Sequence, residues 1–154
     1  MADPPRGTGD PLEYARRLLA RRDHGRAELR AKLAARGFKA GEVAAALTRL
    51  EEDGLLDDSR YARALLEREM GRGHGLAFAR AKARARGLRL PEEPGDLGRE
   101  AESLRKFLRR RHLDPKSLTS GIERAKLLRS LRGRGYTRAA ISTVLGPLAE
   151  EGIE

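Results

Sequence analysis

The sequence contains no cysteine and no tryptophan, and only six of its 154 residues are aromatic. The absence of cysteine excludes disulfide bonds, cysteine zinc sites and cysteine nucleophiles. Valine and isoleucine together occur five times, against 24 leucines and 23 alanines. Because β-branched and aromatic residues favour strands, whereas alanine, leucine and arginine favour helices, we expect an all-α fold.

Long apolar runs are also missing. No segment approaches the ~18 consecutive apolar residues of a membrane helix, and the Pro- and Gly-rich stretch of residues 1–10 (MADPPRGTGD) has no apolar signal core. We therefore expect a cytoplasmic protein with no membrane partner. Residues 1–10 have no periodic apolar positions, which predicts a disordered tail.

The sequence repeats itself. Residues 27–56 align with residues 125–154 at a constant offset of 98, without a gap. The shared positions are apolar or glycine: Leu29, Leu33, Val43, Leu47, Leu50 and Gly54 match Leu127, Leu131, Ile141, Leu145, Leu148 and Gly152. An earlier helix recurs too, since Tyr14 aligns with Tyr61 at an offset of 47 and with Ser103 at an offset of 89. A repeated apolar skeleton with varying charge is typical of tandem packing units.

Each unit is predicted to contain three helices. In the first unit, Asp10 caps a helix that runs to about Arg22, Gly37 ends a second helix over residues 26–36, and Gly54 ends a third over residues 42–53. The predicted boundaries are 11–54, 57–98 and 99–153. Units of this size cannot bury their apolar faces alone, so we expect them to stack into an elongated, curved array.

The middle unit is degenerate. Alanine occupies its two expected leucine positions, Ala79 and Ala83. Its third helix would cover residues 92–98, where Pro94 and Gly95 interrupt the helical pattern. These features indicate either a close approach of helices or a thin local core.

No constellation of residues indicates catalysis. His24, His74 and His112 fall in different units without metal-ligand spacing. The acidic residues 51–53 and 57–58 are more simply explained as ending one helix and capping the next. Residues 71–75 (GRGHG) lack the Gly-Lys-Ser/Thr ending of a phosphate-binding loop. We expect a protein that is not an enzyme and has no catalytic, cofactor-binding or metal-binding residues.

Positive charge is the remaining functional signal. The net charge is +10, and 27 of the 33 basic residues are arginine. The acid-free run between residues 72 and 89 and two later helices favour contact with phosphates or an acidic protein, although solvated helix faces would also explain single residues. The scarcity of aromatics argues against base stacking and favours sequence-independent backbone contact. The candidate binding residues are Arg80, Lys82, Arg84, Arg86, Arg105, Lys106, Arg109, Arg110, Arg129 and Arg132.

Three segments resemble the RecX family of regulatory proteins. They are residues 14–22 (YARRLLARR), 28–38 (ELRAKLAARGF) and 50–62 (LEEDGLLDDSRYA). The resemblance extends over about residues 12–153 and is weakest in the middle unit. Gly25 stands where the family usually has a serine that caps the second helix.

This resemblance implies a regulator, most often an inhibitor, of the RecA recombinase. Family members bind the recombinase filament on single-stranded DNA and limit filament growth, ATP hydrolysis and strand exchange during homologous recombination and DNA repair. We expect a monomer without a cofactor that contacts this filament and, through it, the DNA backbone. Two other interpretations remain open: a sequence-independent helical DNA- or RNA-binding module, and a scaffold that binds an acidic protein.

Overall fold

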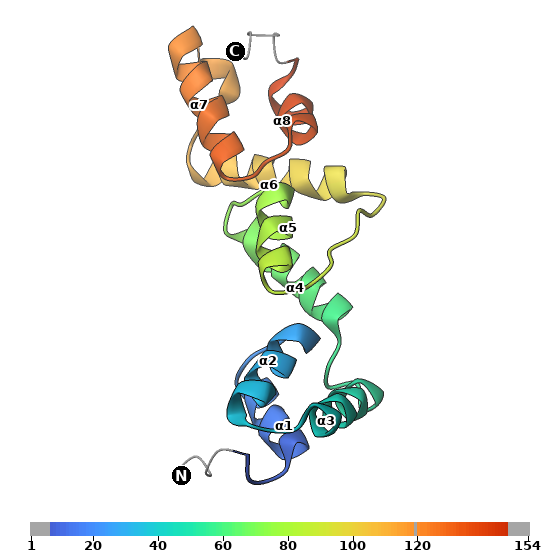
Figure 1. The fold of residues 1–154 in the computed structure, drawn as a ribbon. Helices are drawn as coiled ribbons and strands as arrows, with labels where there is room; N and C mark the ends of the chain where they lie inside the picture. Colours follow the sequence, from blue (N-terminus) through green and yellow to red (C-terminus); the bar gives the residue numbers. More distant parts are fainter. Residues whose placement is uncertain (1–6, 119, 148–154) are drawn as a thin grey trace. The chain divides into compact units, whose positions relative to one another are not determined.

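The computed structural model describes residues 7–118 and 120–147 (Figure 1). These residues contain no strand, and they form eight α-helices and one short 3₁₀ helix: α1 (Pro11–Arg21), α2 (Arg26–Arg36), α3 (Ala40–Glu52), α4 (Asp58–Gly71), α5 (Leu76–Ala85), α6 (Asp96–Arg110), η1 (Pro115–Ser117), α7 (Gly121–Gly133) and α8 (Arg138–Leu145). The predicted all-α class and the tandem three-helix arrangement are confirmed, whereas the curvature of the array stays a prediction.

Local sequence signals account for the ends of the first helices. The Asp10 side chain accepts a hydrogen bond from the Leu12 N–H, and Pro11 occupies the first turn of α1. Gly37 ends α2 in the left-handed conformation with φ = 98°, which a residue without a Cβ adopts at little cost. Helix α3 begins at Ala40, two residues before the predicted start.

Residues 1–6 of the predicted tail lie outside the described residues, as do Leu148 and Gly152 of the repeat. Nearer to α1, the Gly7 N–H donates to the carbonyl oxygen of Arg36 at 2.8 Å. The predicted boundaries of the tail and of the three units stay predictions.

The described residues divide into two compact bodies. The N-terminal body extends through Ala64 and includes Ala83–Leu90, and the C-terminal body contains Leu65–Lys82 and the residues from Pro91 onward. In the N-terminal body, α1, α2 and α3 pack against one another. They enclose a core of Ala15, Leu29, Leu33, Phe38, Val43, Leu47, Leu50 and Leu56.

The C-terminal body has a core made from matching positions. In it, α8 packs against both α6 and α7 (Figure 1). The core contains Leu104, Phe107, Leu108, Leu131, Tyr136 and Ile141. Leu131, Tyr136 and Ile141 align with Leu33, Phe38 and Val43, so the repeat in the sequence corresponds to a repeat in core packing.

The prediction of a separate helix over residues 92–98 was wrong. Only residues 96–98 are helical, and they form the first turn of α6, which continues past the predicted boundary at residue 99. Gly95 is left-handed, with φ = 93°, and the Asp96 carboxylate accepts hydrogen bonds from the Glu93 N–H at 2.9 Å and from Arg80 at 3.1 Å. Pro94 lacks a backbone donor, and these bonds to Asp96 stabilise a turn in place of a helix.

The acidic turn after α3 has a role that the sequence did not predict. As expected, Asp57 caps α4 by accepting from the Arg60 N–H at 2.9 Å. Asp58, however, accepts from the Arg26 N–H at 2.8 Å, at the start of α2. Gly25, the N-cap residue of α2, has no side chain to offer. The carboxylate of α4 therefore replaces the missing serine cap.

Glu100 makes the corresponding interaction in the C-terminal body. Glu100 and Asp58 both align with Pro11 in the repeat, and Leu76 aligns with Arg26. The Glu100 carboxylate accepts from the Leu76 N–H at the start of α5 at 2.9 Å. We call this contact an inter-unit cap: a carboxylate from the first helix of one unit satisfies the start of the second helix of the preceding unit.

Glu100 also accepts hydrogen bonds from Thr137, the residue just before α8. Its Oε1 accepts from the Thr137 N–H at 2.9 Å, and its Oε2 accepts from the Thr137 hydroxyl at 2.5 Å. The Glu100 side chain is fully buried. Burying a carboxylate is costly unless its oxygens are hydrogen-bonded, and here three donors meet that requirement.

A buried glycine accompanies each inter-unit cap. Gly25 and Gly75 precede α2 and α5, respectively. A Cβ on Gly25 would lie 2.8 Å from Leu88 Cδ2, and one on Gly75 would lie 2.2 Å from the carbonyl oxygen of Gly135. The absence of a side chain therefore allows each unit to approach its neighbour closely.

We predict that Glu100→Ala destabilises the protein strongly. Three donors would lose their acceptor, and each unsatisfied buried donor costs about 1–3 kcal/mol, so the free energy of unfolding should fall by about 3 kcal/mol or more. Urea denaturation measures this fall. Glu102→Ala, on the exposed side of the same helix, is the control and should cost less than about 1 kcal/mol. Equal losses in both variants would contradict the capping role.

We also predict that Gly75→Ala lowers the free energy of unfolding by about 3 kcal/mol, because the new methyl group would overlap a backbone carbonyl that cannot rotate away. Gly71→Ala is the matched control, since a Cβ there meets no atom within 4 Å. Thermal unfolding of the two variants beside the parent protein tests the difference. An unchanged melting temperature for Gly75→Ala would show that the close approach is dispensable.

Candidate functional site

The basic side chains of α5 are mostly held by intramolecular partners. Arg80 forms an ion pair with Asp96 at 3.1 Å, and Lys82 forms one with Glu69 at 2.6 Å. Arg86, one residue past the end of α5, donates to the Tyr61 hydroxyl at 2.7 Å. Arg84 is exposed and has no ion pair within the described part of the chain. The run between residues 72 and 89 is acid-free in sequence, but its acidic partners come from outside it.

Glu69 is the centre of a buried charge cluster. Its side chain is 1 % exposed and contacts Lys82, His74 at 2.9 Å and Arg72 at 3.3 Å. Burial raises the pKa of Glu69, but the hydrogen bonds from Lys82 and His74 outweigh this effect, so the pKa lies below its ordinary value. Lys82 therefore stabilises the fold, whatever else it contacts.

The basic residues of α6 remain more accessible. Arg105 and Arg109 share one partner, Glu102, at 3.6 and 3.3 Å, and Arg109 is 63 % exposed. Arg110 donates to the carbonyl oxygen of Gly71 at 3.1 Å, and it forms no ion pair with the described residues. Lys106 is exposed and forms no ion pair within the described residues.

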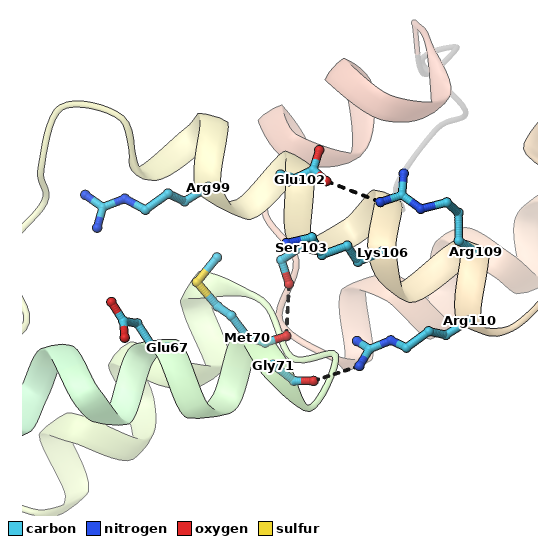
Figure 2. A pocket seen from close by; sticks show the side chains of 9 residues that line it. All are labelled: Glu67, Met70, Gly71, Arg99, Glu102, Ser103, Lys106, Arg109 and Arg110. Atoms are coloured by element: carbon cyan, nitrogen blue, oxygen red, sulfur yellow. Dashed lines mark hydrogen bonds and ion pairs between the residues drawn. The ribbon is translucent and has the colours of Figure 1, made fainter.

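An open groove lies between the end of α4 and α6, with a volume of about 500 Å³. Figure 2 shows the Met70 thioether extending from α4 toward α6, with basic side chains of α6 around it. The Ser103 hydroxyl donates to the Met70 carbonyl oxygen at 3.0 Å and links the two helices. The lining residues are Glu67, Met70, Gly71, Arg99, Glu102, Ser103, Lys106, Arg109 and Arg110.

Three of the predicted binding residues, Lys106, Arg109 and Arg110, thus meet in one groove, whereas Arg129 and Arg132 are exposed on α7. Sequence reasoning missed Arg99 and Met70, which also line it. Arg99 could have been found, because it lies seven residues before Lys106 and hence on the same face of a helix. Met70 could not, because it comes from another helix.

Among the described residues, the histidines and carboxylates lie too far apart to form a metal site. His74 binds Glu69, and the His24 Nδ1 lies 2.9 Å from the carbonyl oxygen of Arg22. Burial lowers the pKa of His24. Across residues 7–118 and 120–147, no group of three or more His, Asp or Glu side chains could hold a metal ion. None of the helices described in that part of the chain combines the length and apolarity needed to cross a bilayer.

Comparison with known proteins gives consistent matches. The family model described as "RecX, first three-helix domain" matches residues 12–50. The regulatory protein RecX of Thermus thermophilus is 44% identical over 129 residues, covering 82% of this chain and 84% of that protein. The regulatory protein RecX of Acidithiobacillus ferrooxidans is 36% identical over 138 residues, covering 89% of both chains.

Solved structures share the fold. A crystal structure of RecX from Lactobacillus salivarius has a TM-score of 0.69 and 18% sequence identity, and the match covers 88% of this chain and 92% of that one. Another crystal structure, of a regulatory protein RecX, has a TM-score of 0.62 and covers 87% of this chain and 70% of that one. At these identities the likeness shows the arrangement of helices alone.

We predict that Lys82→Met lowers the free energy of unfolding by about 1–3 kcal/mol at neutral pH, because Glu69 stays buried with one cation fewer. Lys82 is 31 % exposed, which keeps the loss below that of a fully buried pair. Urea midpoints measure the loss. Lys126→Met, on an exposed position of α7, is the control and should leave the midpoint unchanged.

The same variant has a signature in its pH dependence. Because folding lowers the pKa of Glu69, its carboxylate contributes full stability above the ordinary value of 4.5, and this contribution is lost as pH falls through the lower folded value. Lys82→Met removes a hydrogen bond that lowers the folded pKa, so the folded and unfolded values lie closer together and the variant should lose less stability than the parent protein as pH falls below 4.5. Parallel curves would show that Lys82 does not act through Glu69.

Proposed function

This chain belongs to the RecX family of regulatory proteins, and from that membership we propose that it regulates the RecA recombinase by binding the recombinase filament on single-stranded DNA. Its effect would be to limit filament growth, ATP hydrolysis and strand exchange. The observation that carries the proposal is the 44% identity to a regulatory protein RecX over 82% of this chain. The chain would act by binding and without catalysis.

The charge of the chain supports contact with a polyanionic assembly. The net charge is +10, and Lys106, Arg129 and Arg132 are exposed without an ion pair to the described residues. A chain that touches neighbouring protomers of a filament at several weak sites gains affinity through effective concentration. Ten candidate cations were predicted from sequence; those that are exposed would carry most of this contact.

A second candidate function is sequence-independent nucleic-acid binding. The exposed arginines Arg84, Arg129 and Arg132 favour it, because guanidinium groups bind phosphates well. Such binding should weaken steeply as salt rises, because each phosphate contact releases counterions. It would operate on DNA or RNA in the absence of any recombinase.

We expect the chain to inhibit ATP hydrolysis by purified RecA on single-stranded DNA at less than one chain per recombinase protomer. The reason is that one regulator on a filament would limit the activity of several protomers. A coupled ATPase assay with increasing amounts of the chain measures this effect. Repeating the titration with excess single-stranded DNA is the control, because inhibition by masking of DNA would then disappear.

Each outcome assigns a function. Substoichiometric inhibition that survives excess DNA supports regulation of the recombinase. Unchanged ATP hydrolysis together with salt-sensitive DNA binding rejects it in favour of the nucleic-acid-binding module. If neither effect occurs, a scaffold for an acidic protein remains.

A further inference from the structure

Positive charge is concentrated in one part of the C-terminal body, residues 103–147. This segment contains twelve Lys and Arg residues and only two carboxylates, Asp114 and Glu123. The difference of +10 equals the net charge of the whole chain, so the charges of all other residues balance to zero. A charge this localised favours contact with a polyanion at this segment over contact along the whole chain.

Few of these twelve cations have an anionic partner. Arg105 and Arg109 share Glu102, and the other ten form no ion pair with the described residues. Of the two carboxylates in the segment, Asp114 caps the short helix η1. Glu123 lies in the first turn of α7, where a helix start favours a carboxylate. Most of the cations therefore retain their charge for an external ligand.

The solvent side of α7 carries part of this charge on one continuous surface. Lys126, Arg129 and Arg132 are exposed and follow one another at intervals of three residues, which places them on one side of the helix. Ser130 and Gly133 are exposed between and beside them, and a Cβ on Gly133 would meet no atom within 4 Å. We call these five residues the α7 face. It is open to a large ligand.

The α7 face ends at the first turn of the helix. Ile122 is 70% exposed there, and Glu123 is the only acidic residue of α7. Arg129 and Arg132 lie about 9 and 14 Å beyond Glu123 along the helix axis. The groove between α4 and α6 differs, because two carboxylates lie beside its cations. A dense polyanion therefore fits the α7 face better than the groove.

Two features select the kind of polyanion. Helices α7 and α8 contain no aromatic residue, so the unstacked bases of a single strand would find no ring to stack on. A duplex keeps its bases stacked inside and carries about one charge per 1.7 Å of its axis, so each contacting cation releases more counterions than on a single strand. A protein surface mixes charged with apolar groups and offers fewer anions over the same length. A duplex is therefore the ligand that this face favours.

We propose that the α7 face binds the phosphate backbone of double-stranded nucleic acid, independently of base sequence. The side chains of Lys126, Arg129 and Arg132 pair with phosphates, and the Ser130 hydroxyl donates to a phosphate oxygen. Gly133 leaves room for the backbone at the end of the helix. The inference goes beyond the proposed regulation of RecA, because the ligand is a duplex and the contact needs no recombinase.

The test uses the full chain and fluorescein-labelled probes without recombinase. The probes are two short DNA duplexes of different sequence and an oligo(dT) with the same number of phosphates. Fluorescence anisotropy at ~0.1 M salt should show equal affinity for the two duplexes. The duplexes should bind on the order of fourfold more tightly than oligo(dT), because three contacts each change log Kd with log salt by about 0.9 on a duplex and about 0.7 on a single strand.

Matched double variants locate the contact. Arg129→Gln with Arg132→Gln should weaken duplex binding on the order of tenfold or more and lower the salt dependence of log Kd by about 1.8, since each lost phosphate contact accounts for about 0.9. Arg105→Gln with Lys106→Gln removes two exposed cations of α6 and is the control. It should lower the salt dependence by less than about 0.5. Circular dichroism and urea midpoints confirm that each variant is folded.

Equal losses in the two double variants would overturn the inference, because the contact would then not be centred on α7. Tighter binding of oligo(dT) than of the duplexes would assign the face to single strands and reject it. Displacement of the duplex by poly-glutamate as effectively as by unlabelled duplex, at equal concentration of charge, would indicate an acidic protein instead. Duplex binding through the α7 face without inhibition of ATP hydrolysis would retain the inference and reject regulation of RecA, and inhibition without duplex binding would do the opposite.

Discussion

The buried carboxylate of Glu100 connects three helices of the C-terminal body, α5, α6 and α8. Glu100 has no exposed surface, and its stability depends on donors from two other helices, Leu76 at the start of α5 and Thr137 at the start of α8. Helix starts carry a partial positive charge that favours an anion, so one side chain satisfies two helices at once. The position of α6, and with it the row of cations along the groove, follows from this interaction.

The N-terminal body contains the same kind of inter-unit cap. Asp58 occupies the aligned position in the N-terminal body and satisfies α2 in the same way. Gly25 departs from the serine that is usual in the family, and the structure explains the departure: a carboxylate from the next unit provides the acceptor, and Leu88 occupies the space that a side chain would need. A glycine at position 25 is therefore compatible with a capped α2 because Asp58 supplies the acceptor.

Sequence reasoning succeeded where the determinants are local. The helix class, the Asp10 cap, the Gly37 stop and the repeated core positions all follow from periodicity and turn chemistry. It failed where partners are distant along the chain. The cations of α5 were predicted to face an external anion, yet Glu69 and Asp96 lie outside the run and bind two of them. The groove likewise depends on Met70 and α6 coming together, which no spacing within either helix reveals.

The inter-unit caps also determine when each unit can complete its folding during synthesis. The acceptor that completes α2 lies beyond the residues of α1, α2 and α3, because Asp58 belongs to α4. During synthesis these first helices would emerge from the ribosome with one amide still bonded to water, and the nascent unit would tighten only once α4 follows. In such a repeat protein, each unit becomes fully ordered only after the next unit, which carries its capping carboxylate, has been synthesised.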